Sequence, residues 1–139
     1  MNITENFSLE EMTASASAEA RHLDNKPNAV QMQNLKDLCE NVLEPLRELV
    51  GKPICVTSGF RSEKVNYYAG GVKNSQHLFG RAADISVKGL SPEKLLDILL
   101  ESDIKFDQAI AYRHRGFLHV SYCRGWNRMM YFVNRKRCA

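Results

Sequence analysis

The sequence lacks several features that define common functional classes. Its four cysteines show no Cys-x-x-Cys spacing, so a cysteine-based zinc site is not expected. No apolar run is long enough to cross a bilayer, and no dense Lys/Arg stripe with interleaved aromatic residues points to nucleic acid. The first residues, Met1–Asn6, lack the basic and apolar regions of a signal peptide, so we expect synthesis in the cytosol. We therefore expect neither membrane insertion nor a nucleic-acid partner.

What the sequence does contain is typical of one small globular domain. Its 139 residues can bury one real core but not two, so we assign residues 1–139 to a single domain, and we expect a monomer. The net charge of +3 suits an anionic polymer such as a bacterial wall, but many proteins with neutral partners have the same balance. Cys39 and Cys55 fall in a helical and a strand pattern and are predicted to be buried thiols. The spacing of Cys123 and Cys138 leaves their pairing open.

Helix signals dominate the first third of the chain. Ser8 and Glu11 form a capping-box pattern that starts a short helix. Asn28 is placed to cap a long helix that runs to about Val50, and Pro45 is expected to kink it. Apolar residues three or four apart form one stripe that is predicted to pack in the core: Leu35, Leu38, Val42, Leu46 and Leu49.

Strand patterns alternate with short helices in the rest of the chain. Helices are predicted over 63–68 and from Pro92, which Ser91 would cap. Strands are predicted over 54–58, 83–87, 106–112 and 117–122, with a possible edge strand over 131–133. The turn over 113–116 would join two of these strands as a hairpin. The pattern indicates an α+β fold.

Two histidines and one aspartate stand out as a possible metal site. His77 and Asp84 are joined by a short segment of small residues in which Gly80 allows the chain to bend. Asp84 and His119 each lie on the polar face of an alternating strand pattern, so two neighbouring strands can present both from one side of a sheet. Two imidazoles and a carboxylate are the usual ligands of a catalytic zinc, with water in the fourth position.

Three separated motifs resemble a known family. The stretch from Ser75 to Asp84 is similar to the S-x-H-x-x-G-x-A-x-D signature of the zinc D-Ala-D-Ala peptidases. Thr57–Ser62 is similar to the S-G-[YF]-R-S turn of this family, and Gly116–Ser121 to its last metal-binding strand. The family includes D,D-carboxypeptidases, vancomycin-resistance D,D-dipeptidases and phage L-alanyl-D-glutamate endopeptidases. Phe7–Glu11 and Leu43–Arg47 also resemble its small single-domain branch, which is often found in phages and prophages.

The resemblance implies a fold and a set of site residues. The fold would be that of the hedgehog signalling domain and the D,D-peptidases, with a small antiparallel sheet that carries the site and packs against helices. His77, Asp84 and His119 would bind Zn²⁺. Arg61 would hold a substrate carboxylate or carbonyl, for which a guanidinium is well shaped, although a structural salt bridge is the alternative. Ser75 and Gln76 would contact substrate, with a loop-fixing role as the alternative.

The expected general base is where this sequence departs from the family pattern. Well-known members place an acidic residue or a His two or three positions before the last ligand, where this chain has Phe117 and Gly116. We predict Asp107 as the catalytic base, because it would share a face with His119 if the bulky residues of its strand faced the core. A register slip of one residue would reverse that arrangement. Asp107 as an orienting or turn-capping residue, and His114 as the base, stay open.

The expected function is hydrolysis of amide bonds in peptidoglycan stem peptides. Both the D-Ala-D-Ala carboxypeptidase and the L-Ala-D-Glu endopeptidase type fit the sequence. A zinc-containing module that binds the wall without catalysis is the main alternative, and a zinc that only stabilises the fold is a third. We expect the protein to act on the cell wall in an endolysin-like role, after release through a phage-type pore.

Overall fold

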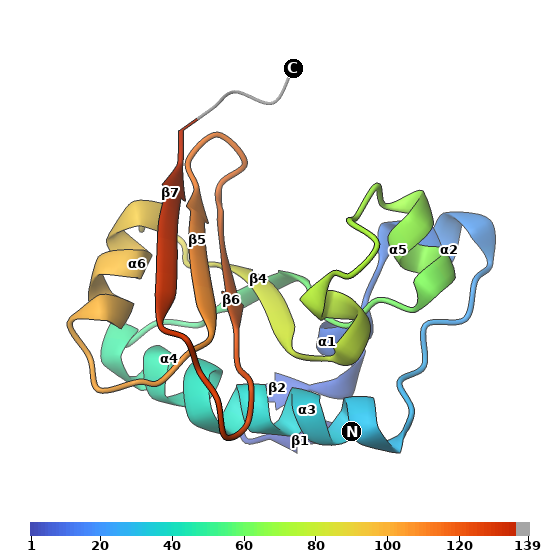
Figure 1. Cartoon of the computed structure of the whole chain (residues 1–139), viewed down its shortest axis with the longest axis horizontal. Helices are drawn as coiled ribbons and strands as arrows, with labels where there is room; N and C mark the ends of the chain where they lie inside the picture. The colour runs from blue at the N-terminus through green and yellow to red at the C-terminus, as the bar shows by residue number, and fades with distance from the viewer. Residues whose placement is uncertain (136–139) are drawn as a thin grey trace.

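A mixed five-stranded sheet runs through the computed structural model, which describes residues 1–135 (Figure 1). The strand order is β3–β4–β6–β5–β7. Neighbouring strands are antiparallel except β5 and β7, which run parallel. The strands are β3 (Cys55–Ser58), β4 (Ala82–Ser86), β5 (Gln108–Tyr112), β6 (Phe117–Ser121) and β7 (Met130–Asn134). The predicted α+β fold is confirmed, including the hairpin and the edge strand.

Helices and a two-stranded ribbon surround this sheet. The ribbon is β1 (Asn2–Thr4) and β2 (Phe7–Ser8). The helical elements are α1 (Leu9–Thr13), α2 (Ala16–Arg21), α3 (Ala29–Leu38), the π-helical turn η1 (Cys39–Leu43), α4 (Glu44–Val50), α5 (Glu63–Tyr68), the 3₁₀ turn η2 (Gln76–Phe79) and α6 (Pro92–Leu100). No helix within the described range is long and apolar enough to span a bilayer.

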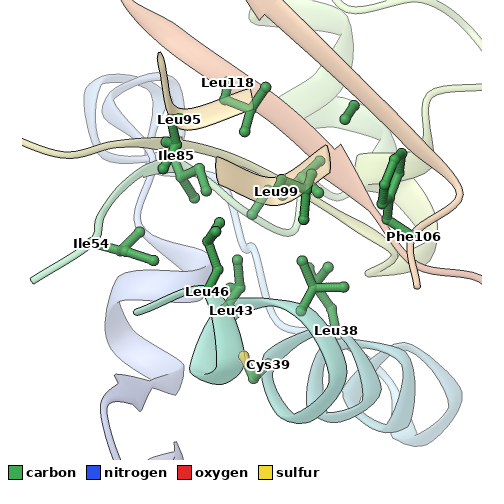
Figure 2. Close-up of a cluster of buried hydrophobic side chains, with 14 of the residues drawn as sticks. Leu38, Cys39, Leu43, Leu46, Ile54, Ile85, Leu95, Leu99, Phe106 and Leu118 are labelled. Carbon is green, nitrogen blue, oxygen red and sulfur yellow. The ribbon is translucent and has the colours of Figure 1, made fainter. Parts of the chain in front are cut away.

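One face of the sheet packs against α3, α4 and α6, and the other face is left for the site. Leu118 and Ile85 extend from the sheet toward Leu46, Leu43 and Leu99 of the helices (Figure 2). All of these side chains are buried. In Figure 1, α5 and α2 lie on the side of the strands opposite α6. The apolar core therefore fixes the orientation of β4 and β6, whose alternate residues must point away from it.

Local capping signals in the sequence are confirmed. Glu11 N–H donates to Ser8 Oγ at 3.1 Å, and Ser8 N–H donates to Glu11 Oε1 at 2.7 Å. Asn28 and Gln31 form the same reciprocal pair at the start of α3. Pro45 does not end the long helix, because a single π turn precedes it and lets the chain continue as α4.

The predicted core stripe is wrong in its last member. Leu49 is 56% exposed, whereas Val50 packs against the core. Leu46, after the π turn over Cys39–Leu43, is still buried as predicted, so the buried face changes only in the last turn of α4. A regular spacing of three or four residues along the whole helix does not predict that change.

Two predictions about cysteines have separate outcomes. Cys39 is buried, as predicted, but Cys55 is exposed. Cys55 opens the edge strand β3, where the side chain opposite to the core face meets solvent. Cys138 lies outside the described residues, so the structure does not test whether it pairs with Cys123.

Candidate metal centre and its cavity

The register of two strands brings Asp84 and His119 together. Asp84 on β4 is paired directly with His119 on β6, and cross-strand partners share a face. His119 Nδ1 lies 2.9 Å from Asp84 Oδ1. Their neighbours Ile85 and Leu118 point into the core, as the alternation requires. The prediction that two strands present both residues from one side is confirmed.

His77 completes the group from the loop before β4. Its Nε2 lies 3.3 Å from Asp84 Oδ1, and its Nδ1 lies 2.7 Å from the carbonyl oxygen of Gly59. A carbonyl oxygen only accepts hydrogen bonds, so Nδ1 carries a proton in this contact, and Nε2, which faces Asp84, is the nitrogen that could bind a metal. One ligand atom from each of His77, Asp84 and His119 lies within 4.8 Å of the others, so the three could hold a metal ion.

The backbone around His77 is held at both ends. Ser75 caps η2 by accepting a hydrogen bond from the His77 N–H at 3.2 Å, which is the loop-fixing role considered for it. Gly80 ends η2 with φ at +72°, a conformation that favours glycine. A Cβ at Gly80 would lie 2.5 Å from the carbonyl oxygen of Gln31. These constraints direct the His77 ring toward Asp84.

The electrostatics of Asp84 suit a permanently ionised ligand. Burial by itself would raise the pKa of Asp84, but hydrogen bonds from His119 and His77 outweigh it and hold the pKa well below its ordinary value. The carboxylate thus carries its negative charge at neutral pH. Two imidazoles and one carboxylate are a donor set that zinc prefers in catalytic sites.

Arg61 contributes both to the local structure and to the site. Its Nε donates to Ser58 Oγ at 3.1 Å and one terminal nitrogen donates to Asn66 Oδ1 at 3.2 Å. The other terminal nitrogen lies 3.7 Å from Asp84 Oδ2. Burial lowers the pKa of Arg61; the negative charge of Asp84 opposes this, and Arg115 adds to the decrease. The salt bridge considered for Arg61 is therefore present, and the side chain also lines the cavity described next.

A cavity of about 340 Å³ opens over these residues. On one side it is lined by the loop from Ala69 to His77, with Arg61, and on the other by β5, β6 and their turn. The second side includes residues that the sequence did not single out: Gln108, Ile110, Tyr112, Arg115 and Phe117. The alternation of β5 could have indicated them, but only with its register known. Among the described residues that line the cavity, Asp84 is the only carboxylate.

The predicted face of Asp107 is wrong. The strand partner of His119 is Ile110, which belongs to the bulky set of alternating residues and not to the set that contains Asp107. Ala109 and Ala111 therefore face the core, where both are fully buried, and Asp107 is buried directly before the strand. The reason is space: α6 packs closely against β5, so the small residues point inward and the bulky ones outward.

Asp107 instead holds a hydrogen-bond network behind the cavity. Its carboxylate accepts hydrogen bonds from Arg128 Nε at 2.9 Å, from an Arg128 terminal nitrogen at 2.8 Å and from Gln76 Nε2 at 2.8 Å. These donors, with Arg128 first, lower the pKa of Asp107 to about 2. Gln76 lines the cavity directly before His77, whereas His114 is exposed on the hairpin turn and is not among the lining residues.

Two histidines and an ionised aspartate that open into a cavity beside an arginine are the arrangement of a metal-dependent hydrolase. The family model described as Peptidase M15 matches residues 5–121, and the chain belongs to this family. A stretch of 44 residues is 48% identical to a protein named zinc D-Ala-D-Ala carboxypeptidase from Streptomyces albus G. That stretch covers 31% of this chain and only 17% of the Streptomyces protein. The predicted membership of the zinc D-Ala-D-Ala peptidase family is confirmed.

Proposed function

We propose that this protein is a zinc-dependent peptidase that hydrolyses an amide bond in the stem peptides of bacterial peptidoglycan. The observation that carries the proposal is the His77–Asp84–His119 group at the base of a cavity, in a chain of the M15 family. The zinc cofactor agrees with the donor set and with the zinc carboxypeptidase that the chain resembles. An endolysin-like role in degrading the wall is part of this proposal.

The chain's own residues would divide the work as follows. His77, Asp84 and His119 would hold the zinc, which when bound supplies an activated water and polarises the scissile carbonyl. Gly59 keeps the proton of His77 on Nδ1, so that Nε2 stays available. Arg61 would bind a substrate carboxylate or carbonyl through its Asp84-facing nitrogen. Asp107 is proposed as a positioning residue that holds the amide of Gln76 at the cavity wall.

One observation favours a second candidate function. The lining residues include no carboxylate besides the proposed ligand Asp84, so no acidic general base faces the cavity within residues 1–135. A module that binds zinc and the wall without catalysis would need none. The peptidase would cleave its substrate and the binding module would not, whereas both would bind zinc.

The test is a digest of purified peptidoglycan, with the fragments read by mass spectrometry, with and without a chelator. New stem-peptide ends that disappear with the chelator and with His77→Ala support the peptidase, and their masses identify the D-Ala-D-Ala or the L-Ala-D-Glu bond. His22→Asn is the matched control, because His22 lies on the surface in a left-handed conformation that Asn tolerates. If the peptidoglycan stays intact although the protein binds zinc in stoichiometric amount, the peptidase proposal is refuted and the binding module is favoured.

A further inference from the structure

A second arginine reaches the cavity from the turn between β5 and β6. The backbone N–H groups of Arg115 and Gly116 both donate to the carbonyl oxygen of Tyr112, at 3.2 and 2.9 Å, which fixes the turn. The Arg115 guanidinium lies 4.9 Å from the ring centre of Phe117 and 5.7 Å from that of Tyr112. Its side chain is therefore folded back over the strands, although the residue stays exposed.

The register shows which face Arg115 covers. Tyr112 pairs with Phe117, and two residues earlier along the same strand Ile110 pairs with His119. Residues two apart share a face, so both rings under Arg115 lie on the face that carries the metal site. Arg115 and Arg61 are accordingly found among the lining residues of one cavity.

The charges of these two arginines are poorly balanced. Asp84 lies 3.7 Å from Arg61, but it is a proposed metal ligand and its charge is shared with the metal once one is bound. Within residues 1–135, no carboxylate forms an ion pair with Arg115, whereas Arg113 on the same turn is paired with Glu93 at 2.7 Å. Arg61 and Arg115 therefore place two positive charges on one cavity.

We propose that Arg115 determines substrate specificity by binding a second carboxylate of the peptide, distinct from the group that Arg61 holds. This inference rests on the proposed peptidase function. A cavity with two cationic walls attracts a polyanionic peptide more strongly than a neutral one. Stem peptides offer two such groups, the α-carboxylate of a γ-linked D-glutamyl residue and the carboxylate of the terminal D-alanine. The rings of Tyr112 and Phe117 hold the guanidinium in place, which reduces the entropy lost on binding.

The experiment uses one synthetic peptide in four forms. The parent is acetyl-L-Ala-γ-D-Glu-L-Lys-D-Ala-D-Ala, and its companions carry a carboxamide in place of the glutamyl carboxylate, of the terminal carboxylate, or of both. Initial rates give KM and kcat for each form with the zinc-loaded wild type, Arg115→Gln, Arg115→Lys and Arg113→Gln. Arg113→Gln is the matched control, since it removes an equal charge from the same turn but one paired with Glu93.

For one of the two carboxylates, the wild type is expected to prefer the free acid, and Arg115→Gln to raise KM for that acid by about three- to tenfold. The amidated form should be unaffected, kcat should change by less than about twofold, and Arg115→Lys should recover part of the preference. The inference would be overturned if the ratio of KM for the free acid to KM for the amide were the same in Arg115→Gln as in the wild type at both positions. An equal loss in Arg113→Gln would also overturn it, because it would indicate only a general surface-charge effect.

The design separates this inference from the proposed function. If the wild type cuts none of the peptides, the peptidase proposal fails for these substrates, and the same four forms are titrated calorimetrically into the zinc-loaded proteins. A loss of acid-over-amide preference in Arg115→Gln would then support the carboxylate site without catalysis. No preference in any protein would refute it.

Discussion

Gly80→Ala probes how strongly the turn between His77 and Asp84 is constrained. Gly80 has a φ of +72°, where an L-residue with a side chain costs about 1–2 kcal/mol. The added Cβ would lie 2.5 Å from the backbone oxygen of Gln31 and 3.3 Å from the Leu35 side chain. Relief of that contact requires η2 to move away from α3, at a further cost of about 1–3 kcal/mol. The free energy of unfolding should fall by about 2–5 kcal/mol in total.

A shift of η2 should also displace His77 in the proposed metal site. Gln31 Nε2 donates to the carbonyl oxygen of Leu78 at 3.1 Å, and Asn34 Nδ2 donates to that of Phe79 at 2.8 Å. Both hydrogen bonds tie η2 to α3, and His77 lies within η2. We therefore expect Gly80→Ala to weaken zinc affinity as well as stability.

The assay is urea denaturation of the metal-free protein, followed by zinc titration against a chromophoric chelator. Gly51→Ala is the matched control: its φ is +71°, and nothing lies within 4 Å of the added Cβ. The free energy of unfolding of Gly51→Ala should fall only by the cost of the left-handed conformation, about 1–2 kcal/mol, and its zinc affinity should not change. Equal destabilisation by the two variants, with zinc binding unchanged in both, would refute the close-approach argument.

The other predictions concern metal binding, pH and thiol reactivity. His119→Ala should abolish stoichiometric zinc binding, as measured by metal analysis after dialysis, and retained zinc would remove His119 from the ligand set. The pKa of Asp107 is lowered from 3.8 to about 2, so its contribution to stability is complete above about pH 4 and is lost as the pH falls through about 2. Asp107→Asn breaks the pair with Arg128 and leaves no group there to titrate. The free energy of unfolding of this variant should therefore fall less steeply with pH over this range than that of the wild type. Parallel curves for the two proteins would contradict the assignment. A thiol reagent should label Cys55 rapidly and leave Cys39 unmodified, because Cys39 is buried and its pKa is raised to about 12, chiefly by burial. Peptide mapping checks this, and rapid labelling of native Cys39 would count against the core packing.

Asp107 shows where reasoning from alternation reaches its limit. The strand pattern separates Asp107, Ala109 and Ala111 from the bulky residues between them, but does not say which set faces the helices. We expected the bulky set to be buried. The close packing of α6 on β5 decides otherwise, and a shift of one residue reverses every side chain of a strand. The same reversal brings Tyr112 and Arg115 into the site, so one wrong assumption hid the residues that carry the specificity proposal.

The π turn before Pro45 shows a related limit within a helix. Local signals such as the Asn28 cap and the Leu35–Leu38 spacing are enough to predict the helix and most of its buried face. They do not predict the π turn over Cys39–Leu43, nor that Val50 packs on the core in place of Leu49. That choice depends on how the whole helix packs against the sheet.

The sequence by itself determined the family, the caps, most elements and the residues of the metal group, because these depend on short-range patterns and on motif chemistry. Residue type, spacing and motif are enough to select His77, Asp84 and His119 as the proposed ligand group. Only the tertiary structure decided the register of β5, the neighbours of Arg61 and the position of Arg115 over its two aromatic rings. Those features depend on which faces the packed core leaves exposed, and that is a property of the assembled layers, which no local segment encodes.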